Sequence, residues 1–216
     1  MSHLKPARAY SRSEYLSDAI VHAVGLAGAV IGGPIAIGLA VVWGHSWWIV
    51  ASLAIYTVTL IAMWVCSGLF NLMQCEDRVI WFRQLDQSAI YLKIAGTYTP
   101  FIALASSTTS FFLAMWLSAL AGVALIMSTP KLRLYYAIPL YLGMGWAGAV
   151  FGGPLLAGVS SLTLTLLVIA GLLYSSGVVF TFLHRLRFHN TIWHLFVLVA
   201  TTSAYMAVVV EVARAQ

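Results

Sequence analysis

Polar side chains spaced by four residues occur in three otherwise apolar regions of this chain. A spacing of four places side chains on one face of an α-helix. Histidine, serine and carboxylate groups arranged in this way are able to transfer protons or hold a metal ion. Taken singly, such residues are more often helix caps than ligands, so their meaning depends on whether the sets meet. The three sets are Glu14, Asp18 and His22; Ser67 and Asn71; and Asn190 and His194.

Two further ionisable residues lie in the segment 85–101, which reads LDQSAIYLKIAGTYTPF. Asp86 is close to its start and Lys93 is in its middle. The chain around them is 62% hydrophobic and 8% charged. An ionisable side chain in an apolar membrane-like setting is energetically expensive, so each of these two residues is a candidate functional residue.

The composition predicts a polytopic membrane protein. A soluble domain carries about a quarter charged residues, and a membrane-spanning helix needs roughly 20 mostly apolar residues. We therefore predict an all-α fold, a seven-transmembrane helix bundle that forms a single domain over residues 1–216. The predicted spans are Ala19–Trp43, Trp48–Leu72, Gln87–Ala105, Phe111–Ser128, Tyr135–Phe151, Thr163–Leu183 and Thr191–Ala213.

The basic residues predict the orientation of the bundle. Nine of the 11 lysines and arginines precede the first span or lie in alternate connections, whereas the remaining connections are uncharged. This is the positive-inside pattern, which places the N-terminal segment 1–18 in the cytoplasm and the C-terminus outside a cell (inner) membrane. It also accounts for the net charge of +5 without a nucleic-acid partner. The nine residues are Lys5, Arg8, Arg12, Arg78, Arg83, Lys131, Arg133, Arg185 and Arg187.

This orientation brings the polar sets to one face of the membrane. The first, second, third and seventh predicted spans each deliver polar side chains to the cytoplasmic side, and no comparable set occurs on the outer side. The convergence of four helices predicts a functional site there. Cys66 and Cys75 fall in the same half, where thiols stay reduced, so we expect no disulfide.

Four motifs cover nearly the whole chain. They are Ser67-Gly-Leu-Phe-Asn71; Leu85-Asp-Gln-Ser-Ala-Ile-Tyr91 with the following AGTYTPF; Gly143-Met-Gly-Trp146; and Asn190-Thr-Ile-Trp-His194. Together they resemble the hemolysin III proteins, the bacterial branch of the progestin and adipoQ receptor (PAQR) family. The AGTYTPF stretch is highly specific, and the first-helix residues Glu14, Asp18, His22 and Gly25 fit the family pattern.

The resemblance implies seven helices with a cytoplasmic N-terminus and a zinc site near that face. In the family, one histidine from the second helix and two from the seventh hold the zinc, beside a serine and an aspartate. That site resembles a lipid amide hydrolase, in which a metal-bound water is the nucleophile. On this sequence the serine is Ser67, the aspartate is Asp86, and the histidine positions fall on Asn71, Asn190 and His194.

Two of the three metal-ligand positions are therefore asparagine. Zinc is held by imidazole, thiolate or carboxylate, so an amide is a poor replacement. His189 adjoins Asn190 but points about 100° away on a helix. Cys66 or Cys75 could be recruited, although nothing in their spacing requires it. We expect no bound catalytic zinc, and a zinc ion held through His194 is the alternative.

Lys93 is a second departure from the family, which usually has an apolar residue there. It lies seven residues after Asp86, on nearly the same helix face and roughly 10 Å further along the axis. One hypothesis is that Lys93 supplies the positive charge that zinc supplies in relatives. The other is that Lys93 snorkels towards the cytoplasmic interface while Asp86 pairs with Arg83.

Three functional hypotheses follow. The first is a protein of membrane-lipid homeostasis with a degenerate zinc site, which need not be an enzyme. The second is an active, metal-dependent lipid amide hydrolase of ceramidase type. The third is a channel or pore, against which the outer halves of the spans offer few polar residues. A membrane lipid is the expected partner, and abundant glycine and alanine permit a homo-oligomer without selecting a face.

Overall fold

The computed structural model describes residues 11–73, 79–105, 109–129 and 134–216. All regular elements in these residues are helices, and five of them, α1, α2, α4, α7 and α8, are long and apolar enough to cross a membrane. The predicted all-α membrane architecture is confirmed to this extent. The helices are α1 Arg12–Val42, α2 Trp47–Leu72, α3 Val79–Leu104, α4 Thr109–Ser128, α5 Leu134–Phe151, α6 Gly153–Ala157, α7 Ser161–Phe182 and α8 His189–Arg214.

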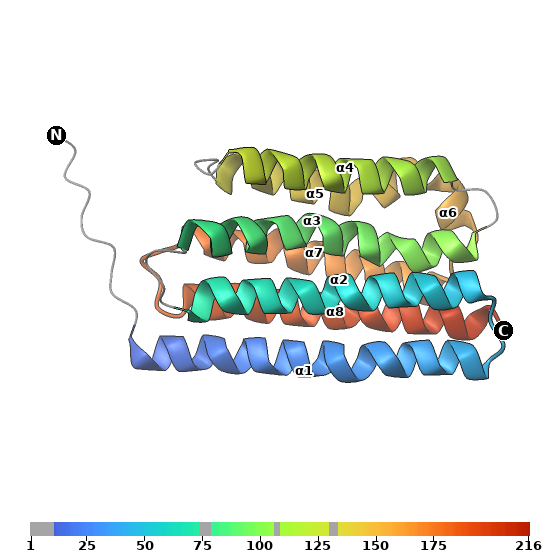
Figure 1. Cartoon of the computed structure of the whole chain (residues 1–216), viewed down its shortest axis with the longest axis horizontal. Helices are drawn as coiled ribbons and strands as arrows, with labels where there is room; N and C mark the ends of the chain where they lie inside the picture. The colour runs from blue at the N-terminus through green and yellow to red at the C-terminus, as the bar shows by residue number, and fades with distance from the viewer. Residues whose placement is uncertain (1–10, 74–78, 106–108, 130–133) are drawn as a thin grey trace.

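The long helices lie side by side and alternate in direction (Figure 1). Helix α3 has the most central position, because it contacts α2, α4, α5 and α8. Helix α1 packs on α2 and α8, and α7 packs on α8 and α5. We call the end at which α1, α3 and α8 begin the N-terminal end of the bundle. Residues from α1, α2, α3 and α8 meet there.

Two helices, α1 and α3, begin well before the residues that the apolar pattern predicts. Helix α1 starts at Arg12, because Ser11 and Glu14 form a capping box that satisfies the first backbone amides. Helix α3 starts at Val79, and the Gln84 amide within its added turns donates to the carbonyl of Ile126 at 2.8 Å. In both cases polar residues extend the helix beyond the apolar stretch. The short helix α6 lies in a stretch predicted as a plain connection.

Close contact between α1 and α2 depends on glycine. A Cβ atom at Gly33 would overlap the side chain of Thr57, and a Cβ atom at Gly25 would lie 2.5 Å from Cζ2 of Trp64. Thr57 is β-branched and donates to the carbonyl of Leu53 at 2.8 Å, so it has little freedom to move away. Small residues at helix contacts in membranes allow the backbones to approach closely.

This packing predicts different effects for two substitutions in the same helix. Gly33→Ala is expected to destabilise the protein by about 1–3 kcal/mol through overpacking against Thr57. Gly28→Ala is the matched control, because a Cβ atom there meets nothing within 4 Å. Thermal unfolding of the purified protein in detergent measures both. An unchanged midpoint for Gly33→Ala would show that α1 and α2 are not packed as described.

Candidate functional site

The first and last helices of the bundle are joined by a buried carboxylate–imidazole contact. Oδ1 of Asp18 in α1 accepts a hydrogen bond from Nδ1 of His194 in α8 at 2.6 Å. Both side chains are at least nine-tenths buried, since each residue is 4% exposed or less. An acceptor at Nδ1 fixes the orientation of the histidine ring, and carboxylates have this role beside functional histidines in many sites.

His22 lies one turn after Asp18 and packs against His194. Nδ1 of His22 donates to the backbone carbonyl of Asp18 at 2.9 Å. Because a carbonyl only accepts, the proton of the neutral ring is on Nδ1, and Nε2 accepts from the hydroxyl of Ser67 at 3.2 Å. The two imidazole rings are edge to face with centroids 4.3 Å apart. The α1 set and the α2 set therefore meet directly.

The two asparagines bond to each other. Nδ2 of Asn190 in α8 donates to Oδ1 of Asn71 in α2 at 2.8 Å. Nδ2 of Asn71 donates in turn to the backbone carbonyl of Ser67 at 2.9 Å, and lies 3.3 Å from its hydroxyl oxygen. An amide bridge thus connects α2 and α8 at the positions where the resemblance implies two metal-binding histidines.

Asp86 in α3 completes the group from a fourth helix. Its carboxyl group interacts with the hydroxyl of Ser67 and lies close to His194 and Asp18. It is half-buried and lines the cavity described below. Ser67, Asn71, Asp86, Asn190 and His194, predicted to converge, are thus in one place with Asp18 and His22. We call these seven residues the polar cluster.

The other residues considered as replacement ligands lie elsewhere or outside the described residues. His189 packs edge to face on His184, with ring centroids 5.4 Å apart. Cys66 is a half-buried free thiol. Cys75 lies outside the described residues.

Glu14 has a structural position rather than a place in the polar cluster. One carboxylate oxygen accepts from the backbone amide of Phe188 at 3.0 Å, and the other accepts from the amide and hydroxyl of Ser11 at 3.0 and 2.7 Å. Phe188 is the N-cap of α8 and has a φ of 62°, a left-handed conformation that costs a non-glycine residue free energy. Glu14 therefore holds the α7–α8 turn against the start of α1.

Lys93 makes its contacts with α7 instead of the polar cluster. Its ammonium donates to the hydroxyl of Tyr174 at 2.5 Å and lies 4.4 Å from the centroid of that ring. The Tyr174 and Thr201 hydroxyls are 2.6 Å apart. Lys93 is 4% exposed, so it does not snorkel to the interface. Among the described residues its ammonium contacts Tyr174 and forms no ion pair with Asp86. The sequence signal for this arrangement is a tyrosine in the middle of the apolar helix α7.

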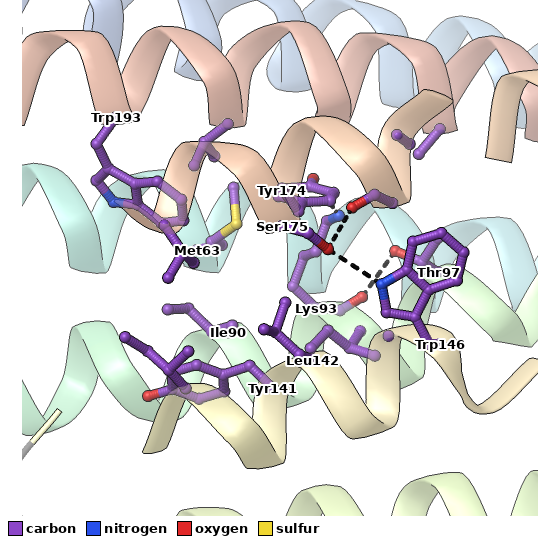
Figure 2. Close-up of a pocket in the computed structure, with 18 of the residues that line it drawn as sticks. Met63, Ile90, Lys93, Thr97, Tyr141, Leu142, Trp146, Tyr174, Ser175 and Trp193 are labelled. Atoms are coloured by element: carbon purple, nitrogen blue, oxygen red, sulfur yellow. Dashed lines mark hydrogen bonds between the residues drawn. The ribbon is translucent and has the colours of Figure 1, made fainter. Parts of the chain in front are cut away.

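A cavity of about 900 Å³ runs along the bundle between α2, α3, α5, α7 and α8. Most of the polar cluster lines its N-terminal end, and apolar and aromatic side chains line the rest. Figure 2 shows Met63, Trp193, Ile90, Tyr141 and Leu142 around one part of it, and Lys93 with Tyr174, Ser175 and Trp146 around another. Volume and lining are those of a site for one elongated, mostly apolar ligand.

Asp18, His22 and His194 also form a candidate metal-binding triad. Their ligand atoms all lie within 4.8 Å of one another, and carboxylate and imidazole are donor types that zinc prefers. This triad differs from the positions that the family resemblance implies, because only His194 is common to both. The sequence spacing shows that Asp18 and His22 share a helix face, but it does not reveal that His194 packs on that face.

Comparisons of the sequence with known proteins decide the family. A family model described as Haemolysin-III related matches residues 11–205. The chain belongs to this family. It is 31% identical to the Hemolysin-3 homolog of Bacillus subtilis (strain 168) over 202 residues, which are 92% of this chain and 94% of the relative. It is 26% identical to the human Monocyte to macrophage differentiation factor over 226 residues, which cover 96% of this chain and 90% of the relative.

A third relative agrees with this assignment. Hemolysin-3 of Bacillus cereus is 30% identical over 162 residues, or 74% of each chain. The predicted resemblance to the hemolysin III branch of the PAQR family is confirmed. With five helices able to cross a bilayer, family membership makes the chain a multi-pass protein of the cell membrane.

The position of Glu14 predicts how the α7–α8 turn responds to its loss. Glu14→Ala leaves the amides of Phe188 and Ser11 without their acceptor, which is expected to cost about 1–3 kcal/mol. The expected readout is faster hydrogen exchange at the Phe188 amide and a lower thermal midpoint. Ser13→Ala is the control, since Ser13 makes only exposed contacts with Ser11 and Arg187. Unchanged exchange at Phe188 in Glu14→Ala would contradict the structural role.

Proposed function

We propose that this chain is a protein of membrane-lipid homeostasis that holds a membrane lipid in the cavity, and that its zinc site is degenerate. The observation that carries the second part is the hydrogen bond between Asn190 and Asn71 at 2.8 Å. These amides stand where the family resemblance implies metal-binding imidazoles, and they satisfy each other. Hydrogen bonds then replace metal coordination as the link between α2 and α8.

The cavity supports the lipid part of the proposal. An acyl chain requires a long apolar channel, and a lipid headgroup requires polar partners at one end. The cavity offers both, because the polar cluster and Lys93 supply polar groups to its lining and residues such as Leu155, Leu164 and Leu167 supply apolar lining. Its volume of about 900 Å³ is in the range of small-ligand sites.

The charge distribution supports an orientation with the N-terminal end in the cytoplasm. Arg12, Arg83, Arg185 and Arg187 lie at that end of the described helices, and Arg214 lies at the other end. Cytoplasmic segments of membrane proteins carry the excess of basic residues. On this proposal the chain crosses the membrane seven times with its N-terminus in the cytoplasm, and the lipid enters from the cytoplasmic leaflet.

The residues at the family ligand positions do not fit a zinc ion. Only His194 offers an imidazole at these positions, which leaves one strong ligand where zinc usually has three or four. A neutral amide oxygen is a weak zinc ligand, and Oδ1 of Asn71 is occupied by the Asn190 amide. We therefore derive no hydrolytic step through a metal at these positions. Asp18 instead orients His194, and the Ser67 hydroxyl donates to Nε2 of His22.

A metal-dependent lipid amide hydrolase is the second candidate, and the closeness of Asp18, His22 and His194 favours it. For this triad to hold an ion, His22 must exchange one of its present hydrogen bonds for the metal. Both nitrogens of His22 are bonded, to the Asp18 carbonyl and to Ser67. The two candidates therefore differ in whether purified protein contains a metal.

Metal content separates the two candidates. Wild-type protein purified with zinc present is expected to contain less than stoichiometric zinc. Asn71→His with Asn190→His is expected to take up about one zinc ion per chain, because three imidazoles then converge. Asn71→Ala with Asn190→Ala is the matched control, which removes the amide bridge without adding ligands. Stoichiometric zinc in the wild type, lost with Asp18→Ala or His22→Ala, would contradict the degenerate site and establish the second candidate.

Blocking the cavity tests the lipid part. Gly145→Trp is expected to displace lipid, because Gly145 lines the cavity and a Cβ atom there meets nothing within 4 Å. Gly143→Trp is the matched control, since Gly143 has the same open space but is not part of the lining. Mass spectrometry of lipids extracted from the purified proteins measures the difference. Equal bound lipid in the two variants would show that the cavity is not the lipid site.

A further inference from the structure

Lys93 is a buried cation that lines the cavity without a counter-charge. An ammonium group has three donors, and the one hydrogen bond it forms with the described residues goes to Tyr174. No carboxylate in the described part of the chain forms an ion pair with it. A charge buried in an apolar bundle without an opposite charge is strongly destabilising. Such a residue in a membrane helix therefore points to a ligand that supplies the opposite charge.

Tyr174 fixes the ammonium at the cavity wall. Its hydroxyl oxygen accepts from Lys93, so its own proton is available for the hydroxyl of Thr201, 2.6 Å away. The lysine side chain is thereby held across the space between α3 and α7, and Figure 2 shows it reaching Tyr174 beside Ser175 and Trp146. Ser175 is occupied by Trp146, whose indole N–H donates to it at 3.0 Å. Two donors of the ammonium remain for a ligand.

The depth of Lys93 separates this place from the polar cluster. Lys93 follows Asp86 by seven residues, a rise of roughly 10 Å along α3. Apolar lining lies beyond it, including Leu155, Leu164 and Leu167. An apolar chain whose charged end is at Lys93 would thus extend towards the C-terminal end of the bundle. A ligand with its polar end at the polar cluster would place apolar chain beside Lys93 and leave the ammonium uncompensated.

We propose that Lys93 and Tyr174 form a seat for the carboxylate of a single-chain, long-chain carboxylic acid. This inference rests on the proposed lipid-binding function and names the class of lipid. One cation matches one negative charge, and the neighbouring phenol and hydroxyls are neutral, so a monoanion fits better than a phosphate monoester. A cavity of about 900 Å³ is the size of a site for one small ligand, which favours one acyl chain over two.

Binding of three probes to the purified full chain tests the proposal. The probes are hexadecanoic acid, its methyl ester and hexadecyl phosphate, titrated in detergent micelles and measured by native mass spectrometry. The wild type is expected to bind the acid about 10- to 100-fold more tightly than the ester, as expected for a hydrogen-bonded charge. Lys93→Met is expected to remove this preference, and Lys93→Arg to keep most of it.

Two further variants distinguish a specific role of Tyr174 in binding the acid from a general effect of substitutions in α7. Tyr174→Phe keeps the ring and removes the hydroxyl that holds Lys93, so it is expected to weaken acid binding with little effect on the ester. Ser176→Ala is the control, because Ser176 is exposed and bonds only within α7. The proposal is overturned if Lys93→Met binds the acid as the wild type does, or if the phosphate binds more tightly than the acid.

The same titration separates failure of this inference from failure of the proposed function. Equal, tight binding of acid and ester by both wild type and Lys93→Met would overturn the carboxylate seat and leave a lipid site in place. Absence of binding for every probe would overturn both the seat and lipid binding in the cavity. Metal content is independent of either result.

Discussion

The contact between Asp18 and His194 is the interaction on which the N-terminal end of the bundle depends. Polar groups enclosed by apolar helices gain stability only when they find partners, because no water is present to replace them. This contact joins the first helix to the last at 2.6 Å. His22 then bonds to the Asp18 backbone and to Ser67, so α2 is tied to the same centre.

The amide bridge between Asn71 and Asn190 has a different consequence from a metal at the same place. A metal ion would hold α2 and α8 together and polarise a bound carbonyl group. A pair of amides supplies the link and has no Lewis acidity. On the proposed function, the family framework of Ser67, Asp86 and His194 persists around a site whose chemistry has changed. The cavity beside it remains large enough for a lipid.

On the proposed carboxylate site, one buried lysine determines where a ligand binds. The family resemblance implies an apolar residue at the position of Lys93. In this chain Tyr174 and Thr201 provide the polar chain that holds the ammonium across the cavity. On that proposal, the charge of Lys93 fixes the position of the polar end of the ligand. The polar cluster lines the N-terminal end of the cavity, on the other side of Lys93 from the acyl chain.

The sequence predicted the helical class, the family and the residues of the polar cluster, because helical spacing and charge placement carry that information. It did not predict that Glu14 leaves the cluster to hold Phe188, since a spacing of four is equally compatible with both. The pairing of Lys93 with Tyr174 was also missed, because rotation of α7 relative to α3 is set by tertiary packing. The amide bridge and the packing of His194 on α1 depend on contacts between helices far apart in the sequence.

The central claim is that the polar cluster is held by hydrogen bonds rather than by a metal. Anomalous diffraction at the zinc absorption edge, from crystals grown with zinc, tests this most directly. The account predicts no anomalous peak among Asp18, His22, Asn71, Asn190 and His194, with Nδ1 of His194 still bonded to Asp18. An anomalous peak from a zinc ion bound by His194, Asp18 and His22 would contradict it.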